Sequence, residues 1–187
     1  TKGTTPTSVG HKFVSEGINF IKVESISLSG NFISKKFGHI TEEGHNTLKR
    51  SQLKNGDILF SIAGALGRTA IVNEVILPAN TNQALAIIRL KEDSTFLNEY
   101  ILSTLKSGYT IEQVENLKGG VAQQNLSLGQ IKSFQIPLPP LPQQKQIVAI
   151  LDKAFAAIET AKANAAQNLL NAKELFESYL QNIFENK

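Results

Sequence analysis

The side chains that could support catalysis are scattered through this sequence and form no familiar catalytic pattern. A DNA amino-methyltransferase would be expected to carry an Asn or Asp followed by two prolines and an aromatic residue, but Pro139 and Pro140 stand between leucines. A restriction nuclease of the common kind needs carboxylates and a lysine around a metal ion. The only acid-any-Lys triplet is Glu185, Asn186 and Lys187, at the end of the sequence. We therefore predict a protein without catalytic residues of its own.

Metal and cofactor sites are not predicted either. The histidines are His11, His39 and His45, which lack the spacing of metal ligands, and the sequence has no Cys to complement them. The turn between Gly64 and Gly67 is not a nucleotide-binding loop, because Arg68 is followed by residues typical of a strand.

The same turn allows two interpretations. In the first it is a tight hairpin whose glycines adopt positive φ. In the second, Ser61, the backbone at Gly64 and the side chain of Arg68 lie close to a nucleic-acid backbone, where missing Cβ atoms permit approach and Arg supplies charge.

Basic residues gather in one part of the sequence. The net charge is +3 and the pI about 9.1, which is compatible with nucleic-acid binding without requiring it. Lys35, Lys36, Lys49 and Arg50 fall in a short segment with Gly38 and Gly44, which we expect to be a loop; its lysines and arginine are either phosphate contacts or a solvated surface.

An uninterrupted helical pattern runs from Gln143 to Glu185, after prolines at 137, 139, 140 and 142. At about 1.5 Å per residue this helix would be roughly 65 Å long. Its apolar or small residues recur at spacings of four and three with one stutter, which is typical of a coiled coil. They are Ile147, Leu151, Ala154, Ile158, Ala161, Ala165, Leu169, Ala172, Phe176, Tyr179 and Ile183. The alternative is a helix that packs back on its own domain.

The rest of the sequence favours an α+β fold, with a strand-rich domain over residues 1–142 followed by the long helix over 143–187. We expect strands over 18–23, 58–62, 69–72 and 83–90, a polar corner over 78–82, and a helix over 96–105. A turn is expected at Asn55-Gly56-Asp57, and capping boxes are expected at Thr110 with Gln113 and at Ser127 with Gln130.

No apolar run approaches the roughly 20 residues that span a bilayer, and no charged-then-apolar leader is present, so we expect a soluble, cytoplasmic protein with no membrane contact. The sequence starts without Met, which suggests that its start has been trimmed or processed.

Several motifs together resemble one known family. They are Gly3-Thr4-Thr5-Pro6, Gly56-Asp57-Ile58-Leu59-Phe60-Ser61, Gly64 and Gly67 with Thr69 and Ala70, Asn82-Gln83, Gly119-Gly120, Gln124-Asn125-Leu126, and Ile136-Pro137-Leu138-Pro139-Pro140-Leu141 with Gln144 and Ile147. This set is similar to the specificity subunit of type I restriction-modification enzymes, with its target recognition domain. The resemblance covers nearly the whole sequence.

The resemblance implies a non-catalytic subunit that reads double-stranded DNA and binds methyltransferase (modification) and restriction subunits. Family members usually carry two recognition domains and two conserved long helices, whereas this sequence has one of each. It therefore resembles a half-subunit or a fragment of a whole subunit. We expect it to form an antiparallel homodimer through the long helix and to read an interrupted palindrome.

The residues expected to bind DNA divide into two groups. Lys35, Lys36, Lys49, Arg50, Arg68 and Lys118 would contact phosphates on one groove-shaped surface. The amides of Gln123, Gln124 and Asn125 would read bases, since amides pair well with adenine edges. The alternative function is that of a coiled-coil adaptor or scaffold whose domain binds protein.

Overall fold

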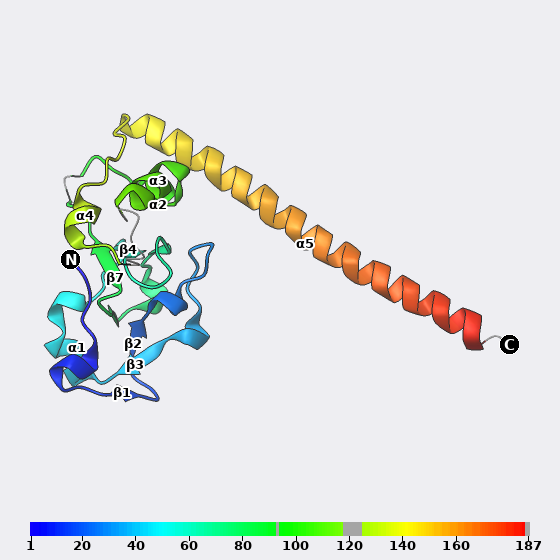
Figure 1. Ribbon diagram of the computed structural model, residues 1–187, viewed down its shortest axis with the longest axis horizontal. Coiled ribbons are helices and arrows are strands. Elements are labelled where there is room, and N and C mark those ends of the chain that lie inside the picture. The colour runs from blue at the N-terminus through cyan, green and yellow to red at the C-terminus, as the bar shows by residue number, and fades with distance from the viewer. Residues whose placement is uncertain (93, 118–124, 186–187) are drawn as a thin grey trace. The chain divides into compact units, whose positions relative to one another are not determined.

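The computed structural model describes residues 1–92, 94–117 and 125–185. Within them the chain divides into two units, Thr1–Gln144 and a second unit that starts at Lys145. The first is a strand-rich α+β domain and the second is a single long helix (Figure 1). The predicted fold class is therefore confirmed.

The domain contains two sheets. The first has the order β1-β3-β2-β6 and the second the order β5-β4-β7. The strands are β1 (Phe13–Val14), β2 (Ile18–Ile21), β3 (Gly38–Ile40), β4 (Ile58–Ser61), β5 (Thr69–Ile71), β6 (Ala79–Thr81) and β7 (Leu85–Ile88). All pairs are antiparallel except β2 with β6.

Helices follow and separate these strands. The α-helices are α1 (Glu42–Thr47), α2 (Asn98–Lys106), α3 (Gly108–Leu117), α4 (Leu128–Lys132) and α5 (Leu141–Glu185), and the short 3-10 helices are η1 (Pro6–Val9), η2 (Val23–Ser25), η3 (Ser34–Lys36), η4 (Lys49–Ser51) and η5 (Glu74–Ile76). None of the described helices is long and apolar enough to cross a membrane.

One apolar core joins the two sheets. Ile21 of β2 and Ala79 of β6 pack in the same buried cluster as Leu59 of β4 and Ile87 of β7. The four strands of this cluster are short, and they are stabilised because both sheets cover the same core.

Several local predictions are confirmed. Asn55 and Gly56 form a turn, with Gly56 at φ 83°, and β4 starts directly after Asp57. At α4 the Ser127 hydroxyl accepts the N–H of Gln130, and the Gln130 side chain accepts the N–H of Ser127, as a capping box requires.

Other local predictions are wrong. Within the expected polar corner over 78–82, residues 79–81 form a strand, because β6 pairs in parallel with β2. The basic segment is not a loop, since it contains β3 and α1. Thr110 is no cap: α3 starts at Gly108, and the Thr110 hydroxyl donates to the Thr104 carbonyl.

α5 starts at Leu141, two residues before the predicted Gln143. Pro142 occupies the first turn, where its missing N–H is not needed. Gln144 is fully buried. Its Oε1 accepts the Leu97 N–H at 3.0 Å, and its Nε2 donates to Thr95 O at 3.0 Å and to Pro139 O at 2.9 Å.

Replacing Gln144 by Ala should lower the free energy of unfolding by about 2 kcal/mol, because buried backbone groups lose their partners. Urea unfolding of the full chain would measure this, with Gln143→Ala as the control, since Gln143 is exposed one residue earlier on the same helix. Equal effects of the two substitutions would show that the buried amide does not fix the start of α5.

Candidate nucleic-acid interface

The β4–β5 turn contains residues that were considered in the sequence as possible DNA contacts, Ser61, Gly64 and Arg68. Ser61 is fully buried, and its hydroxyl donates to Ala65 O and accepts the Arg68 N–H at 2.8 Å. Gly64 and Gly67 have φ values of 73° and 80°, which residues with a side chain rarely adopt. The tight-hairpin interpretation is confirmed. The buried Ser61 side chain shapes this turn and offers no surface to a ligand.

Arg68 turns into the domain. Its Nη1 lies 2.8 Å from Ile26 O and 3.4 Å from Val23 O, and its Nε is buried without a partner. The guanidinium therefore fixes the segment after β2. These bonds involve Nη1 alone, and the DNA phosphate contact expected of Arg68 stays a prediction.

The predicted pair Lys35 and Lys36 precedes β3, whereas the predicted pair Lys49 and Arg50 follows α1. Lys35 and Lys36 are exposed on η3, immediately before β3, and Ser25 Oγ donates to the Lys36 carbonyl at 2.9 Å. Lys49 and Arg50 are exposed on η4, after α1. Among the described residues no hydrogen bond or ion pair joins the two pairs, and the single groove-shaped surface expected from the sequence stays a prediction.

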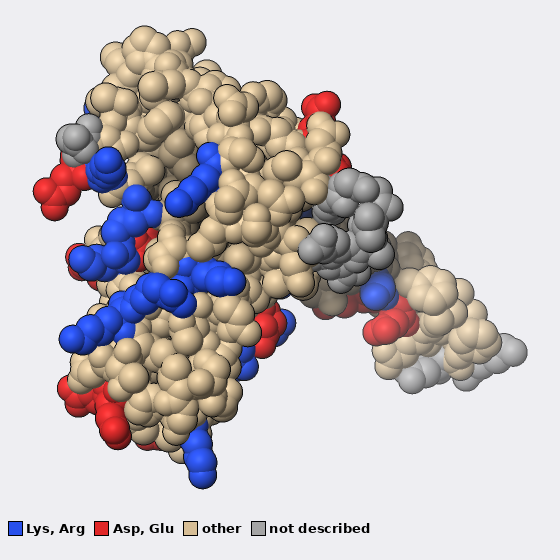
Figure 2. Space-filling model, turned by 60° about the vertical axis from the view of Figure 1, so that its left-hand side comes forward, with Lys and Arg blue, Asp and Glu red and all other residues tan. Residues whose placement is uncertain are grey.

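Arg50 instead belongs to a group of cations around Thr1, which we call the N-terminal basic cluster: Arg50, Arg89 and Lys132. Burial lowers the pKa of the Thr1 amino group, and the positive charges of Lys132, Arg89 and Arg50 lower it further, against the opposing effect of Asp57. Thr1, Arg89 and Lys132 line the same cavity, and Arg50 donates to Thr4, three residues after Thr1. Figure 2 shows Lys and Arg side chains in a belt across one face of the molecule.

Contacts hold two members of the cluster in place. Arg50 donates to Thr4 Oγ1 at 3.2 Å. Arg89 donates from Nε and Nη2 to the two carboxylate oxygens of Asp57, both at 2.6 Å, and this hydrogen bonding is the main cause of its raised pKa. Arg89 and Lys132 were not predicted as DNA contacts. They stand at the ends of β7 and α4, far from Arg50 in sequence, and carry no local signal.

Of the three amides predicted to read bases, only Asn125 lies within the described residues. Gln123 and Gln124, like Lys118, lie outside the described residues. Asn125 is exposed and forms an isolated bridge with Ala63, and the next N–H, that of Leu126, donates to Ile62 O at 2.8 Å. The fold thus brings Asn125 beside the turn that contains Gly64.

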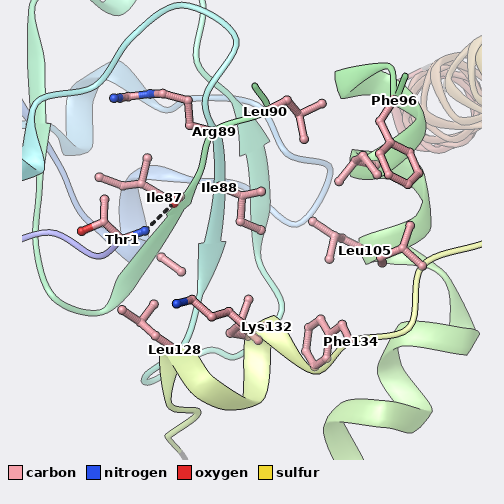
Figure 3. A pocket seen from close by; sticks show the side chains of 14 residues that line it. Thr1, Ile87, Ile88, Arg89, Leu90, Phe96, Leu105, Leu128, Lys132 and Phe134 are labelled. Carbon is pink, nitrogen blue, oxygen red and sulfur yellow. Dashed lines mark hydrogen bonds between the residues drawn. The ribbon is translucent and has the colours of Figure 1, made fainter. Parts of the chain in front are cut away.

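An apolar cavity of about 440 Å³ lies beneath the N-terminal basic cluster. Its walls come from β7, α2, α4 and the segment that follows α4, and Lys132 extends along it toward Thr1 (Figure 3). The described residues that line it include no Asp, Glu, His or Ser. Across the described residues, no group of three or more His, Asp or Glu could hold a metal ion. The lining is apolar apart from Thr1, Arg89 and Lys132.

Comparison with known proteins agrees with this description. Residues 2–168 match the family model described as the type I restriction modification DNA specificity domain. The type I restriction enzyme EcoBI specificity subunit of Escherichia coli is 28% identical over 91% of this chain and 35% of its own length. A putative type I restriction enzyme specificity subunit of Haemophilus influenzae, S.HindORF215P, is 34% identical over 66% of this chain and 31% of its own. The putative type I restriction enzyme MjaX specificity subunit of Methanocaldococcus jannaschii is 28% identical over 91% of this chain and 41% of its own length.

Solved structures share the fold. A chain from a structure on complex assembly and conformational transition of the type I R-M system has a TM-score of 0.72 at 20% identity, over 97% of this chain and 42% of its own. The HsdS subunit from Thermoanaerobacter tengcongensis has a TM-score of 0.70 at 18% identity, over 97% of this chain and 45% of its own length. The chain thus spans between about a third and under half of these relatives. Because the family model covers the domain and more than half of α5, the chain belongs to the family of type I restriction modification DNA specificity domains.

Proposed function

We propose that the chain reads one half of a two-part target in double-stranded DNA for a type I restriction-modification complex. The observation that carries the proposal is the family match, which runs through the recognition domain into α5. This match favours a DNA-specificity subunit over the alternative of a protein-binding adaptor. The chemistry on DNA would belong to partner subunits, and this chain would contribute recognition alone.

In this proposal the N-terminal basic cluster attracts DNA phosphates, and the predicted amides read bases. Arg50 and Lys132 supply positive charge that attracts phosphates irrespective of sequence, whereas the charge of Arg89 is paired with Asp57. Asn125, with Gln123 and Gln124, supplies amides that can pair with adenine edges. Asn125 supports this division, because it is exposed beside the β4–β5 turn rather than buried in the core.

α5 offers apolar surface for more than one partner. The predicted seam is exposed, with Leu169 60%, Phe176 63% and Ile183 61% accessible. Apolar residues outside the seam are exposed as well, including Leu170, Leu175 and Phe184. At 100° per residue, the apolar residues over 169–184 span about 220° of the helix, wider than the stripe of a two-stranded coiled coil.

This width supports two kinds of contact. The seam would pair with the same helix of a second copy in antiparallel orientation, and the flanking apolar residues would bind a modification subunit, with a restriction subunit joining outside. A two-fold axis across α5 places identical recognition domains on inverted half-sites. The target should therefore be a palindrome interrupted by unread bases.

Co-expression with the modification subunit of the native host tests the proposal. We expect the two proteins to copurify and to methylate adenine in an interrupted palindrome, mapped by sequencing of the modified DNA. Copurification with structural or signalling proteins only, with no methylated site, would contradict the proposed function. Methylation of an asymmetric two-part site would contradict the homodimer while leaving DNA reading intact.

Replacing Arg50 and Lys132 together by Ala should weaken binding to every duplex about equally. The slope of log affinity against log salt should become less negative by about 2, since each phosphate contact releases about one counterion. Lys12→Ala is the control, because Lys12 is exposed near β1, outside the cluster. Titrations across a salt series would measure both quantities, and an unchanged slope would show that the cluster is only solvated.

A further inference from the structure

The connection between β2 and β3 carries a tight turn at Ser27–Asn31. The Ser27 N–H donates to Asn31 O at 2.9 Å, and the Gly30 N–H donates to Ser27 O at 3.1 Å. The Ser27 hydroxyl accepts the Asn31 N–H at 2.9 Å and lies 2.9 Å from the Ser29 hydroxyl. Figure 1 draws this connection as a loop that projects from the domain. The turn has one conformation fixed by its own hydrogen bonds.

Two cations from other elements clamp this turn to the domain. Arg68, next to β5, donates to Ile26 O, and Lys106 of α2 donates from Nζ to Ser29 O at 2.8 Å. Burial lowers the pKa of Lys106. Gly30 has a φ of 93°, and a Cβ there would lie 2.8 Å from the backbone oxygen of Thr69, so this position of the turn needs a glycine.

Leu28 at the tip of this turn is 88% exposed. The other apolar side chains of the connection pack inward: Ile26 is fully buried, and Val23, Phe32 and Phe37 pack against the core. The hydrogen-bonded turn therefore presents the Leu28 side chain to solvent, where this side chain gains no free energy from burial.

The connection that carries this apolar tip also carries exposed positive charge. Lys35 and Lys36 are exposed a few residues further along, and Ser25, at the base of the turn, is bonded to the Lys36 backbone. Glu24 of η2 opposes them and is itself paired with Lys22 at 3.4 Å. Arg68 and Lys106 donate to backbone carbonyls, so their charges add to those of Lys35 and Lys36.

We infer that Leu28 acts as an apolar wedge that inserts at a base step of the bound DNA, while Lys35 and Lys36 hold the flanking phosphates. This inference rests on the proposed function. Proteins that deform DNA insert apolar side chains of this kind between bases, unstack one step and bend the duplex. The cost of bending depends on the step, and pyrimidine–purine steps deform most easily. Leu28 would then select for such a step without forming a hydrogen bond to it.

The surroundings favour DNA over a protein partner. A protein interface has an apolar centre of several residues with few charges in it, whereas Leu28 is an isolated apolar residue with lysines nearby. An apolar side chain on a hydrogen-bonded turn, in a connection with exposed lysines, fits the stacked bases and phosphates of a duplex.

Duplexes of the mapped target with 2-aminopurine at successive positions would test the wedge, using the full chain with its modification subunit bound. Apart from the adenine that a bound modification subunit would flip out of the stack, binding of the unsubstituted protein should raise the fluorescence at one further step, where the base is unstacked. Leu28→Ala should abolish this rise and weaken target binding by about tenfold, since a straight duplex no longer wraps against the protein surface. Leu28→Met should keep most of both effects.

Val75→Ala is the matched control, because Val75 is 89% exposed on η5 and lies outside the turn; it should change neither fluorescence nor affinity. Target binding without raised fluorescence at any further step, or equal behaviour of Leu28→Ala and the unsubstituted protein, would overturn the wedge and leave the proposed function standing. Weaker copurification of Leu28→Ala with the modification subunit, at unchanged DNA affinity, would assign Leu28 to a protein contact instead. Absence of any target binding would overturn both inferences.

Discussion

Aspartate at both Ala161 and Ala165 of α5 is expected to dissociate the proposed homodimer. Both positions lie at the centre of the seam, where small side chains let two helices approach closely. In the pair, the substitutions would bury charges of one sign near the two-fold axis, at a cost of about 3–5 kcal/mol. The dissociation constant should therefore rise by roughly 1,000-fold, and sedimentation at micromolar concentration should show the monomer.

The matched control places the same substitutions at Ala156 and Ala163. These alanines are exposed and lie on the opposite face of α5, since each residue turns the helix by about 100°. Helix propensity and net charge change equally in the two variants, so only the position of the charges differs. A control that dissociates as readily as the seam variant, or a seam variant that remains dimeric, would contradict pairing through the seam.

Replacing Arg89 by Ala should destabilise the domain by roughly 2–3 kcal/mol. Asp57 is 1% exposed, and without Arg89 its carboxylate would keep the Lys54 N–H, at 2.7 Å, as its remaining described partner. The Arg89 side chain is 43% exposed, so the loss is smaller than for a fully buried pair. The pKa of Arg89 is raised in the folded protein, so the charged guanidinium stabilises the fold at every pH below the ordinary pKa of Arg. This stabilisation is lost only as the pH rises through the pKa of Arg89 in the folded state. The effect should thus be constant across neutral pH.

Urea unfolding of Arg89→Ala, Asp57→Asn and the double variant would measure the coupling between the two side chains. Asp57→Asn in the Arg89→Ala background should recover part of the loss, because a neutral amide replaces the unpaired carboxylate. Arg50→Ala provides the control, since Arg50 is exposed and donates to a hydroxyl. Additive effects of the two substitutions would show that the pair does not act as a unit.

The sequence predicted the features that depend on near neighbours. The long helix has no internal Pro or Gly after its first turn, and the turn before β4 and the capping box of α4 each follow from residues a few positions apart. In all three cases the stabilising contacts are formed within the segment itself, so the pattern of residue types is enough to identify them.

Features created by distant contacts were not predictable in the same way. β6 is a strand because it pairs with β2, and nothing in Ala79, Asn80 and Thr81 favours a strand over a polar corner. Arg68 resembled a phosphate contact, but its guanidinium bonds to carbonyls after β2. The N-terminal basic cluster draws its members from η4, β7 and α4, so only the fold brings them together.

The pairing of β2 with β6 also bears on how the chain matures during synthesis. Ile21 O accepts the Thr81 hydroxyl from 60 residues away, and Ile87 O accepts the Thr1 amino group from 86 residues away. A ribosome-bound chain that has emerged only as far as β5 holds β2 with one edge open, and the segment at Thr1 has no strand to join. Open strand edges recruit other chains. These two contacts therefore form only after residues 81 and 87 have left the ribosome, and until β6 has emerged the edge of β2 stays open to other chains.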